Sequence, residues 1–222
     1  MIFKLIDNIF GTKSDTGKHK TYHKVKYAYH GLRCYNRGLN KSERKVKNTL
    51  SHELNLKKYF IFNNLTLQKV DGSSQIDHVV VSPYGVFVIE TKDYSGWIFG
   101  SKEGKVWTQV LPGGNKNTFQ NPIRQNFSHI KTLQKHLPFI QTSSFKTVIA
   151  FTRHSQFKTI KPHEVKYINE VGSYINEFDI QIIGRSAYFM AIGKLSQLCQ
   201  SIDISPNEHI KNLNTSHNAS KK

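Results

Sequence analysis

The residues between 75 and 92 combine two acids and a lysine with the pattern of a β-hairpin. Two apolar runs, rich in β-branched residues, lie on either side of Ser82-Pro83-Tyr84-Gly85, whose residue types favour a turn. If Ser82 pairs with Gly85, Asp77 lies directly opposite Glu90 on the same face of the hairpin. Lys92 comes two residues after Glu90 and therefore shares that face. The pattern predicts that Asp77, Glu90 and Lys92 converge at one end of the hairpin.

Two interpretations of this cluster are open from the hairpin alone. Opposed carboxylates repel each other, and a divalent cation between them would relieve the repulsion. Mg²⁺ prefers carboxylate and water oxygens and keeps positions open for substrate phosphates, so Lys92 would then orient a water or stabilise the reacting phosphate. In the second interpretation, Glu90 and Lys92 form an exposed ion pair on an edge strand and Asp77 is a turn residue. A slip of one residue in the register would also turn Asp77 to the opposite face.

Two helices are predicted to flank the hairpin. The first begins near Ser42 as its N-cap, runs to about residue 54, and carries Glu43 on its core-facing side. Taken alone, an acid in the first turn more often favours the helix dipole than forms a site. The second helix opens at Asn121-Pro122, with asparagine as the N-cap and proline in the first turn. Its predicted core-facing residues are Ile123, Phe127, Ile130, Leu133 and Leu137, beside a polar stripe of Gln125, His129, Thr132 and His136.

The rest of the chain alternates further strands with one more helix. We expect strands at residues 58–67, 145–152 and 179–183, a mobile loop at 111–120, and a helix at about 186–200. We expect the tryptophans of a second hairpin-like element, residues 97–108, to pack inside the protein. This order predicts an α/β (α+β) fold with a mixed central β-sheet flanked by helices. One core domain is expected over residues 41–204, between a basic N-terminal arm (1–40), with a candidate short helix, and a polar C-terminal tail (205–222).

The charge of the chain indicates a polyanionic partner. It carries 32 Lys and Arg against 15 Asp and Glu, a formal net charge of +17, which exceeds what solubility requires. Nucleic acid is the first candidate and an anionic membrane the second. Tyrosines interleaved with the basic residues of the arm suit phosphate contacts with stacking, although a solvated linker would have the same composition. The residues expected to contact nucleic acid are Lys18, Lys20, Lys24, Lys26, Arg33, Arg37, Lys116, Arg124, Lys131 and Lys135.

Two features bear on location. No stretch of the sequence approaches the length of a transmembrane segment, and the apolar residues 1–10 are too few to span a bilayer. They could dock on the core or lie on a membrane surface. Cys34 and Cys199 lie far apart and match no metal-ligand or disulfide pattern, which favours a reducing compartment and a cytoplasmic protein.

Six short motifs follow one another in a specific order between about residues 40 and 155. They are Ser42-Glu43-x-x-Val46, Gln75-Ile76-Asp77-His78, Gly85-Val86-Phe87-Val88-Ile89-Glu90-Thr91-Lys92, Gly96-Trp97-Ile98, Trp107, and Asn121-Pro122-Ile123-Arg124-Gln125-Asn126. Together they resemble the NERD domain, the nuclease-related domain of bacterial proteins. That family is considered a branch of the PD-(D/E)XK nuclease-like superfamily, so the resemblance implies a restriction-endonuclease-like core. Ser42 stands where the family usually has glycine, and Ile76 replaces the proline of the superfamily's name, as is normal for this branch.

The resemblance implies a metal-dependent nuclease that hydrolyses phosphodiester bonds, with DNA favoured over RNA and Mg²⁺ or Mn²⁺ as the cofactor. It implies that Asp77 and Glu90 are metal ligands, with Glu43 from the first helix beside them. Lys92 would be the lysine of the acid-x-lysine element and Gln125 the polar residue of the second helix. These five are the candidate catalytic residues.

Other readings stay open. Nucleases of this fold often pair, so a homodimer is one expectation. A non-catalytic nucleic-acid-binding module of the same fold is an alternative function, and a peripheral membrane protein that uses residues 1–10 and the arm is another. The sequence leaves open whether the substrate is single- or double-stranded, whether cleavage is endo or exo, and which process it serves.

Overall fold

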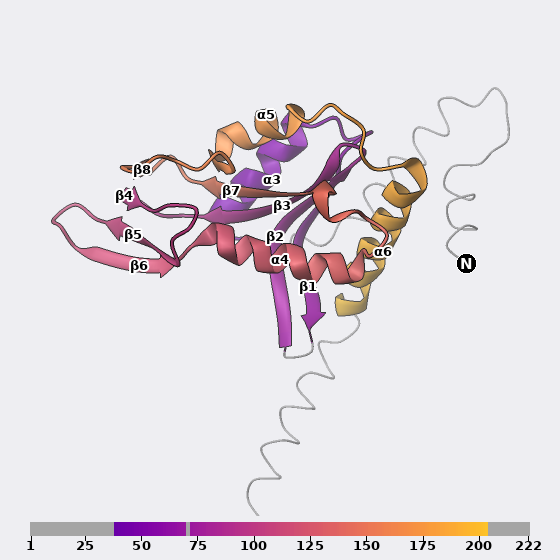
Figure 1. Cartoon of the computed structure of the whole chain (residues 1–222), viewed down its shortest axis with the longest axis horizontal. Coiled ribbons are helices and arrows are strands. Elements are labelled where there is room, and N and C mark those ends of the chain that lie inside the picture. The colour runs from indigo at the N-terminus through magenta and orange to yellow at the C-terminus, as the bar shows by residue number, and fades with distance from the viewer. Residues whose placement is uncertain (1–37, 70–71, 204–222) are drawn as a thin grey trace, which may run out of the picture.

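The computed structural model describes residues 38–69 and 72–203 (Figure 1). The six basic contact residues of the arm, Cys34 and residues 204–222 lie outside them. The helices are α3 (Lys41–Glu53), α4 (Pro122–His136), α5 (Val171–Asn176) and α6 (Arg185–Asp203), with short 3-10 turns at Thr142–Ser144 and Ile168–Glu170. The strands are β1 (Phe60–Lys69), β2 (Gly72–Ser82), β3 (Gly85–Lys92), β4 (Gly96–Phe99), β5 (Val106–Val110), β6 (Lys116–Gln120), β7 (Phe145–Phe151), β8 (Ser155–Phe157) and β9 (Val165–Tyr167). The predicted mixed α/β fold is confirmed.

The central sheet has five strands in the order β1-β2-β3-β7-β9. β1, β2 and β3 are antiparallel neighbours, while β7 pairs in parallel with β3 and β9 in parallel with β7. The β2–β3 hairpin has the predicted register, with Ser82 paired to Gly85 and His78 to Ile89. Strands on both sides of β3 and helices on both faces of the sheet bury it along most of its length.

Helices cover both faces of the central sheet (Figure 1). Because side chains alternate along a strand, Val79 and Val88 face α4 and α6, whereas Val80 and Phe87 face α3 and α5. α4 begins as predicted, with Asn121 capping the backbone N–H of Ile123. The two faces of the sheet therefore carry separate apolar clusters, and the side chains of β3 reach a different helix pair on each face.

The N-cap of α3 is Asn40, so the prediction of Ser42 is wrong. The Asn40 side chain accepts the backbone N–H groups of Ser42 and Glu43, and the Glu43 side chain accepts the backbone N–H of Asn40 at 3.0 Å. This reciprocal pair is a capping box. Ser42 instead donates its hydroxyl to Asp93, which ties the start of α3 to the segment after β3.

A second sheet, in the order β6-β5-β4-β8, continues two strands of the first. β4 follows β3 along the chain, and β8 follows β7. β3 and β7 are parallel neighbours in the first sheet, and β4 and β8 are parallel neighbours in the second. Backbone hydrogen bonds from Thr152 to Lys92 and from Gly96 to His154 connect the pairs across the junction. Gly96 has φ +78°, and a Cβ atom there would collide with the carbonyl oxygen of Val110. The junction between the sheets therefore requires glycine.

Both tryptophans were expected to pack inside the protein, but only one of them does. Trp107 is fully buried and stacks on Phe151 with ring centroids 6.1 Å apart. Trp97 is 48% exposed, so the prediction is wrong for this residue. The physical reason is the two-residue period of β4, in which Ile98 takes the inward position and its neighbour points outward.

Three other local predictions are wrong. Lys116–Gln120 is strand β6, so only the first part of the expected loop 111–120 is a loop. Residues 179–183 form no strand, because the backbone N–H groups of Ile182 and Ile183 bind the Pro83 carbonyl. Phe127 is 56% exposed, because Asn126 occupies the inward position of α4 that the pattern assigned to it.

Cys199 on α6 forms a disulfide. The expectation drawn from the cysteine spacing is therefore wrong for this residue. The argument for a reducing compartment therefore no longer holds.

Within residues 38–69 and 72–203, no helix is both long and apolar enough to cross a membrane.

Candidate active site

Glu90 is the centre of a buried polar cluster near the end of β3. Its side chain points toward α4 and the residue is 4% exposed. Oε1 of Glu90 accepts hydrogen bonds from Lys92 Nζ and from Gln125 Nε2, both at 2.7 Å. Lys92 Nζ also donates to Gln125 Oε1 at 2.9 Å. Strand alternation brings Lys92 to the face of Glu90, and the first turn of α4 brings Gln125 to both, so three predicted residues are in contact.

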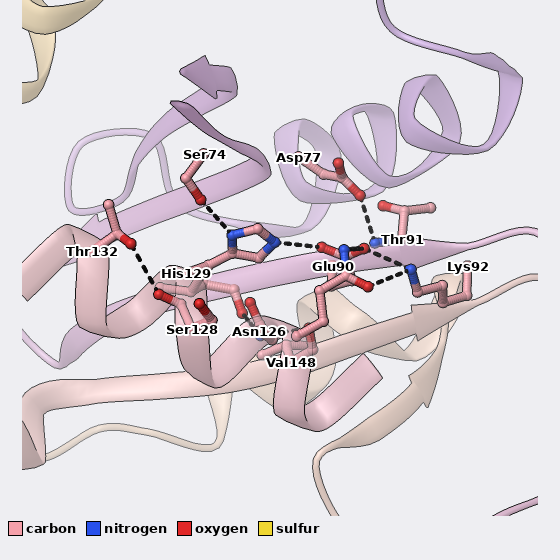
Figure 2. A network of polar contacts seen from close by, with 12 residues as sticks. Ser74, Asp77, Glu90, Thr91, Lys92, Asn126, Ser128, His129, Thr132 and Val148 are labelled. Carbon is pink, nitrogen blue, oxygen red and sulfur yellow. Dashed lines mark hydrogen bonds and ion pairs between the residues drawn. The ribbon is translucent and has the colours of Figure 1, made fainter. Parts of the chain in front are cut away.

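The other oxygen of Glu90 faces a histidine that the sequence analysis did not assign to the site. His129 Nε2 lies 3.3 Å from Glu90 Oε2, and His129 Nδ1 lies 2.8 Å from Ser74 Oγ (Figure 2). If the Ser74 hydroxyl donates to Nδ1, the neutral ring carries its proton on Nε2, toward Glu90. Ser74, His129 and Glu90 thus form a chain of polar contacts from β2 through α4 to β3.

Glu90 stays ionised despite its burial. Burial favours the neutral carboxyl, but the contact with His129 and the charge and hydrogen bond of Lys92 outweigh it and hold the pKa of Glu90 below its usual value. The carboxylate is therefore the fixed negative charge around which Lys92, Gln125 and His129 are arranged.

Asp77 does not pair with Glu90 across the hairpin, which corrects the predicted register at this residue. The β2–β3 ladder ends at His78 and Ile89, and Asp77 Oδ2 accepts the backbone N–H of Thr91 at 2.7 Å (Figure 2). The carboxylate thus takes the place of a backbone partner for β3 where the strands separate. Asp77 is still close enough to Glu90 for the two charges to interact.

The pairing of β2 with β1 is also interrupted at the level of Asp77. Asn64 has φ +52° and interrupts the β1–β2 pairing, which resumes at Leu65 and Ile76. Asparagine is among the residues that tolerate this left-handed conformation best. Beyond this point β1 and β2 continue as a two-stranded ribbon past the edge of α4 (Figure 1), and this ribbon carries Ser74 to His129.

The folded protein disfavours the charged form of Asp77. Burial and the negative charge of Glu90 raise its pKa to about 7, with a smaller contribution from Glu43, while the Thr91 N–H and Lys92 act in the opposite direction. Lys92 donates hydrogen bonds to Glu90 and Gln125. Burial and Glu90 therefore disfavour the charged form of Asp77 more than Lys92 and the Thr91 N–H favour it.

Glu43 is near the cluster but is not part of its contact network. Both of its carboxylate oxygens are held by Asn40 in the capping box of α3. Its charge nevertheless reaches Asp77, as the raised pKa of that residue shows. The structure brings Glu90, Lys92 and Gln125 into contact, leaves Asp77 at the edge of the cluster, and turns Glu43 toward its own helix.

The fit of the cluster to a divalent cation rests on its two carboxylates. In the described part of the chain, no group of three or more His, Cys, Asp or Glu side chains is arranged to hold a metal ion. Mg²⁺, however, is usually bound by one or two carboxylates and completes its shell with water and substrate phosphates. Asp77 and Glu90 provide two carboxylates that are close enough for their charges to interact. The donor chemistry therefore fits.

Asn126, next to Gln125 on α4, has a structural role. It is fully buried, and its Nδ2 donates to the Val88 carbonyl at 2.7 Å and to the Val148 carbonyl at 3.4 Å. It thereby fixes α4 over β3 and β7. Because α4 holds Gln125 and His129 as well, this contact sets the height of both side chains above Glu90.

The described residues predicted to bind nucleic acid are all on the surface. Lys116 lies on β6, and Arg124, Lys131 and Lys135 follow one side of α4. Lys131 Nζ lies 4.8 Å from the centroid of the exposed Phe127 ring, and Arg124 donates to the Glu103 carbonyl at 3.1 Å. No contact joins these four residues to the Glu90 cluster.

Sequence signals existed for part of what was missed. His129 follows Gln125 by four residues, and this spacing places both on one face of a helix. Once Gln125 is assigned to the site, His129 is the next residue to test. No local signal points to Ser74, because its contact with His129 joins residues far apart in the sequence.

A mixed sheet that holds an acid-x-lysine pair on one strand and a further acid on the neighbouring strand defines a nuclease-like core. Residues 39–152 match the nuclease-related domain family, NERD, and the chain belongs to this family, whose general superfamily is PD-(D/E)XK. All five candidate catalytic residues lie within the match. The chain is 38% identical over 149 residues to an uncharacterized protein of Bacillus anthracis, an overlap of 63% of this chain and 67% of that protein. No solved structure matches the chain.

Proposed function

We propose that this protein is a Mg²⁺- or Mn²⁺-dependent nuclease that hydrolyses phosphodiester bonds in DNA. The observation that carries the proposal is the position of Lys92. Its Nζ lies 2.7 Å from Glu90 Oε1 and 2.9 Å from Gln125 Oε1, and its charge acts on Asp77, whose pKa is raised. A lysine held in this way among carboxylates is suited to a site that receives phosphate. Membership of the nuclease-related domain family supports the same chemistry.

Each candidate residue has a proposed role. Asp77 and Glu90 would hold the divalent cation, with Glu43 as a third carboxylate nearby. A cation there would make a bound water more acidic and offset charge on the scissile phosphate. Lys92 would stabilise the negative charge that grows on the phosphate or orient the attacking water. Gln125 would keep Lys92 and Glu90 in place through its amide, which contacts both.

The basic residues would hold the nucleic-acid backbone without reading its sequence. Lys116, Arg124, Lys131 and Lys135 are exposed, and the chain as a whole carries a net charge of +17. Binding that depends on phosphate contacts releases counterions, so the affinity should fall steeply as salt is raised. Whether two copies pair on the substrate stays a prediction.

The test is cleavage of plasmid and linear DNA in Mg²⁺, Mn²⁺ or EDTA. Lys92→Ala should abolish cleavage and largely preserve DNA binding, because it removes the site lysine and leaves the surface charges. Lys102→Ala is the matched control, since it breaks an equally short ion pair, 2.7 Å to Glu164, outside the cluster. Undiminished cleavage by Lys92→Ala, or equal loss in both variants, would contradict the proposal.

One observation favours a second candidate function, nucleic-acid binding without turnover. Glu90 Oε1 already receives hydrogen bonds from Lys92 and Gln125, and Glu43 is held by Asn40. If these contacts persist on substrate, the carboxylates are not free to bind a cation. Binding of DNA without any metal-stimulated cleavage would support this function over the first.

A further inference from the structure

The outer side of the second sheet exposes large apolar side chains close together. Trp97 and Phe99 on β4 are 48% and 36% exposed, whereas Ile98 between them is fully buried. Val106 on β5 is 59% exposed. The register pairs Trp97 with Val110 and Phe99 with Thr108, which places all of these side chains on one side of the sheet. We call Trp97, Phe99 and Val106 the aromatic face; a contiguous patch of this kind marks an interaction site.

The aromatic face is bordered by positive charge. The strands of the second sheet, residues 96–99, 106–110, 116–120 and 155–157, contain no aspartate or glutamate. Lys158 Nζ lies 4.8 Å from the centroid of the Trp97 ring. Lys116 pairs with Val110, which in turn pairs with Trp97, so it lies in the same row of the sheet. Among the ion pairs of the described residues, neither lysine contacts a carboxylate.

Flat aromatic rings beside lysines are complementary to a chain of bases joined by phosphates. Trp97 and Phe99 are two residues apart on one strand, a spacing of roughly 6.6 Å. The bases of a flexible single strand can separate to reach two such rings, and every base offers a flat face for stacking. The bases of a duplex are paired and stacked on each other, so they cannot.

We infer that the aromatic face binds single-stranded nucleic acid, with bases stacked on Trp97 and Phe99 and phosphates near Lys116 and Lys158. The contact between Lys158 and the Trp97 ring does not prevent this, because an exposed cation–π contact is weaker than base stacking and the lysine can move to a phosphate. The inference rests on the proposed function in one respect: it takes the bound strand to be the substrate.

The aromatic face begins a few residues after Lys92 in the chain. β4 begins at Gly96, a short link after Lys92, and β8 follows β7 in the same way. The backbone hydrogen bond from Thr152 to Lys92 joins the two strand pairs at the end of the central sheet. Ile98, between Trp97 and Phe99, clusters with Ile123 of α4, so the aromatic face is turned away from the side of the sheet that holds Glu90. A nucleic-acid strand bound on this face would reach Lys92 around the end of the central sheet.

The test uses the full chain with Glu90→Gln, in EDTA, so that no strand is cut. The probes are an oligothymidylate of about 12 nucleotides, within the usual site sizes of stacking domains, and a duplex of equal length. Trp107 is fully buried, so quenching of tryptophan emission reports on Trp97. We expect strong quenching by the single strand and little by the duplex. The double variant Trp97→Ala with Phe99→Ala lacks this reporter, so its binding is followed by the fluorescence anisotropy of dye-labelled oligonucleotides. It should bind the single strand at least about 10-fold more weakly and the duplex less than about twofold more weakly.

Phe139→Ala is the matched control, because Phe139 is 37% exposed and lies outside the second sheet. It should leave both affinities unchanged. Equal loss of single-strand and duplex binding in the double variant, or no loss, would overturn the inference. So would a double variant that loses only self-association, since the face would then bind a second copy of the chain.

The two proposals can fail separately. Selective single-strand binding without any metal-stimulated cleavage would overturn the nuclease and leave the stacking face in place. Metal-dependent cleavage with normal single-strand binding by the double variant would overturn only the stacking face.

Discussion

Two strands of the second sheet directly follow two strands of the central sheet along the chain, yet the two sheets carry different kinds of side chain. β3 and β7 belong to the central sheet, and their continuations β4 and β8 belong to the second sheet. The central sheet ends in charged groups gathered around Glu90. The second sheet is held by aromatic packing, in which Trp107 stacks on Phe151 and meets the edge of Phe157 at 6.0 Å.

The difference follows from what burial demands of each kind of group. A buried charge is costly unless other groups pair with it, so Glu90 requires Lys92, Gln125 and His129 around it. Aromatic rings need no partner of opposite charge, and the second sheet can therefore expose one face without loss of its core. The charged groups therefore gather at the end of β3, and the exposed aromatic groups lie on β4, the next strand of the chain.

The largest effect should come from the charged end. Glu90→Gln removes the negative charge that pairs with Lys92, and we expect cleavage to fall by about 10²–10³-fold, a common cost of losing one fixed electrostatic group. Quenching by oligothymidylate should be unchanged, because the aromatic face is intact. Parallel loss of cleavage and quenching would show that the two sheets do not act separately.

The next effect concerns the core of the second sheet. Trp107→Ala should destabilise the protein by about 3–5 kcal/mol, since it empties a large buried volume between Phe151 and Phe157. Urea unfolding followed by circular dichroism measures it. Trp97→Ala, at an exposed position, should change stability by less than about 0.5 kcal/mol. Two separate unfolding transitions would mean that the second sheet is not part of one cooperative unit with the central sheet.

A third effect separates the two carboxylates. The folded-state pKa of Asp77, about 7, lies above its ordinary value of 3.8, so the folded protein binds more protons than the unfolded chain between these values and loses stability as pH rises through them. In EDTA, Asp77→Asn should therefore stabilise the protein by about 2 kcal/mol at pH 8 and by little below pH 4. Glu90→Gln should destabilise it at pH 8, because Lys92 then loses its charged partner. Equal responses would contradict the distinction between Asp77 and Glu90.

The smallest effect should come from His129. Because His129 contacts Glu90 Oε2 and not the reacting atoms, His129→Ala should lower kcat about 10-fold, or about 1.4 kcal/mol, with little change in KM. His136→Ala, two turns further along the same helix, is the control and should retain full activity. A change in KM alone would point to a role in substrate binding.

Local sequence rules predicted much of the frame. Turn residues set the hairpin register, which the structure confirms from Ser82–Gly85 to His78–Ile89. Asn121 and Pro122 marked the start of α4 correctly. These features depend on neighbours within a few residues, and propensity and capping rules describe such neighbours well.

Features set by distant contacts were missed. The β6 strand, the exposure of Trp97 and the inward position of Asn126 all depend on which surfaces pack together. The contact of Ser74 with His129 joins residues far apart in the sequence. No periodicity within one segment contains this information.

The sequence by itself determined which chemical groups are available and that Glu90 and Lys92 share a face, because a strand alternates with a period of two. Only the tertiary structure decided how those groups are used. Packing of α4 on β3 placed Gln125 and His129 against Glu90, and the divergence of β2 from β3 gave Asp77 the backbone of Thr91 instead of a cross-strand partner. The physical reason is that hydrogen bonding and the cost of burying charge depend on every group nearby in space, wherever it lies in the chain.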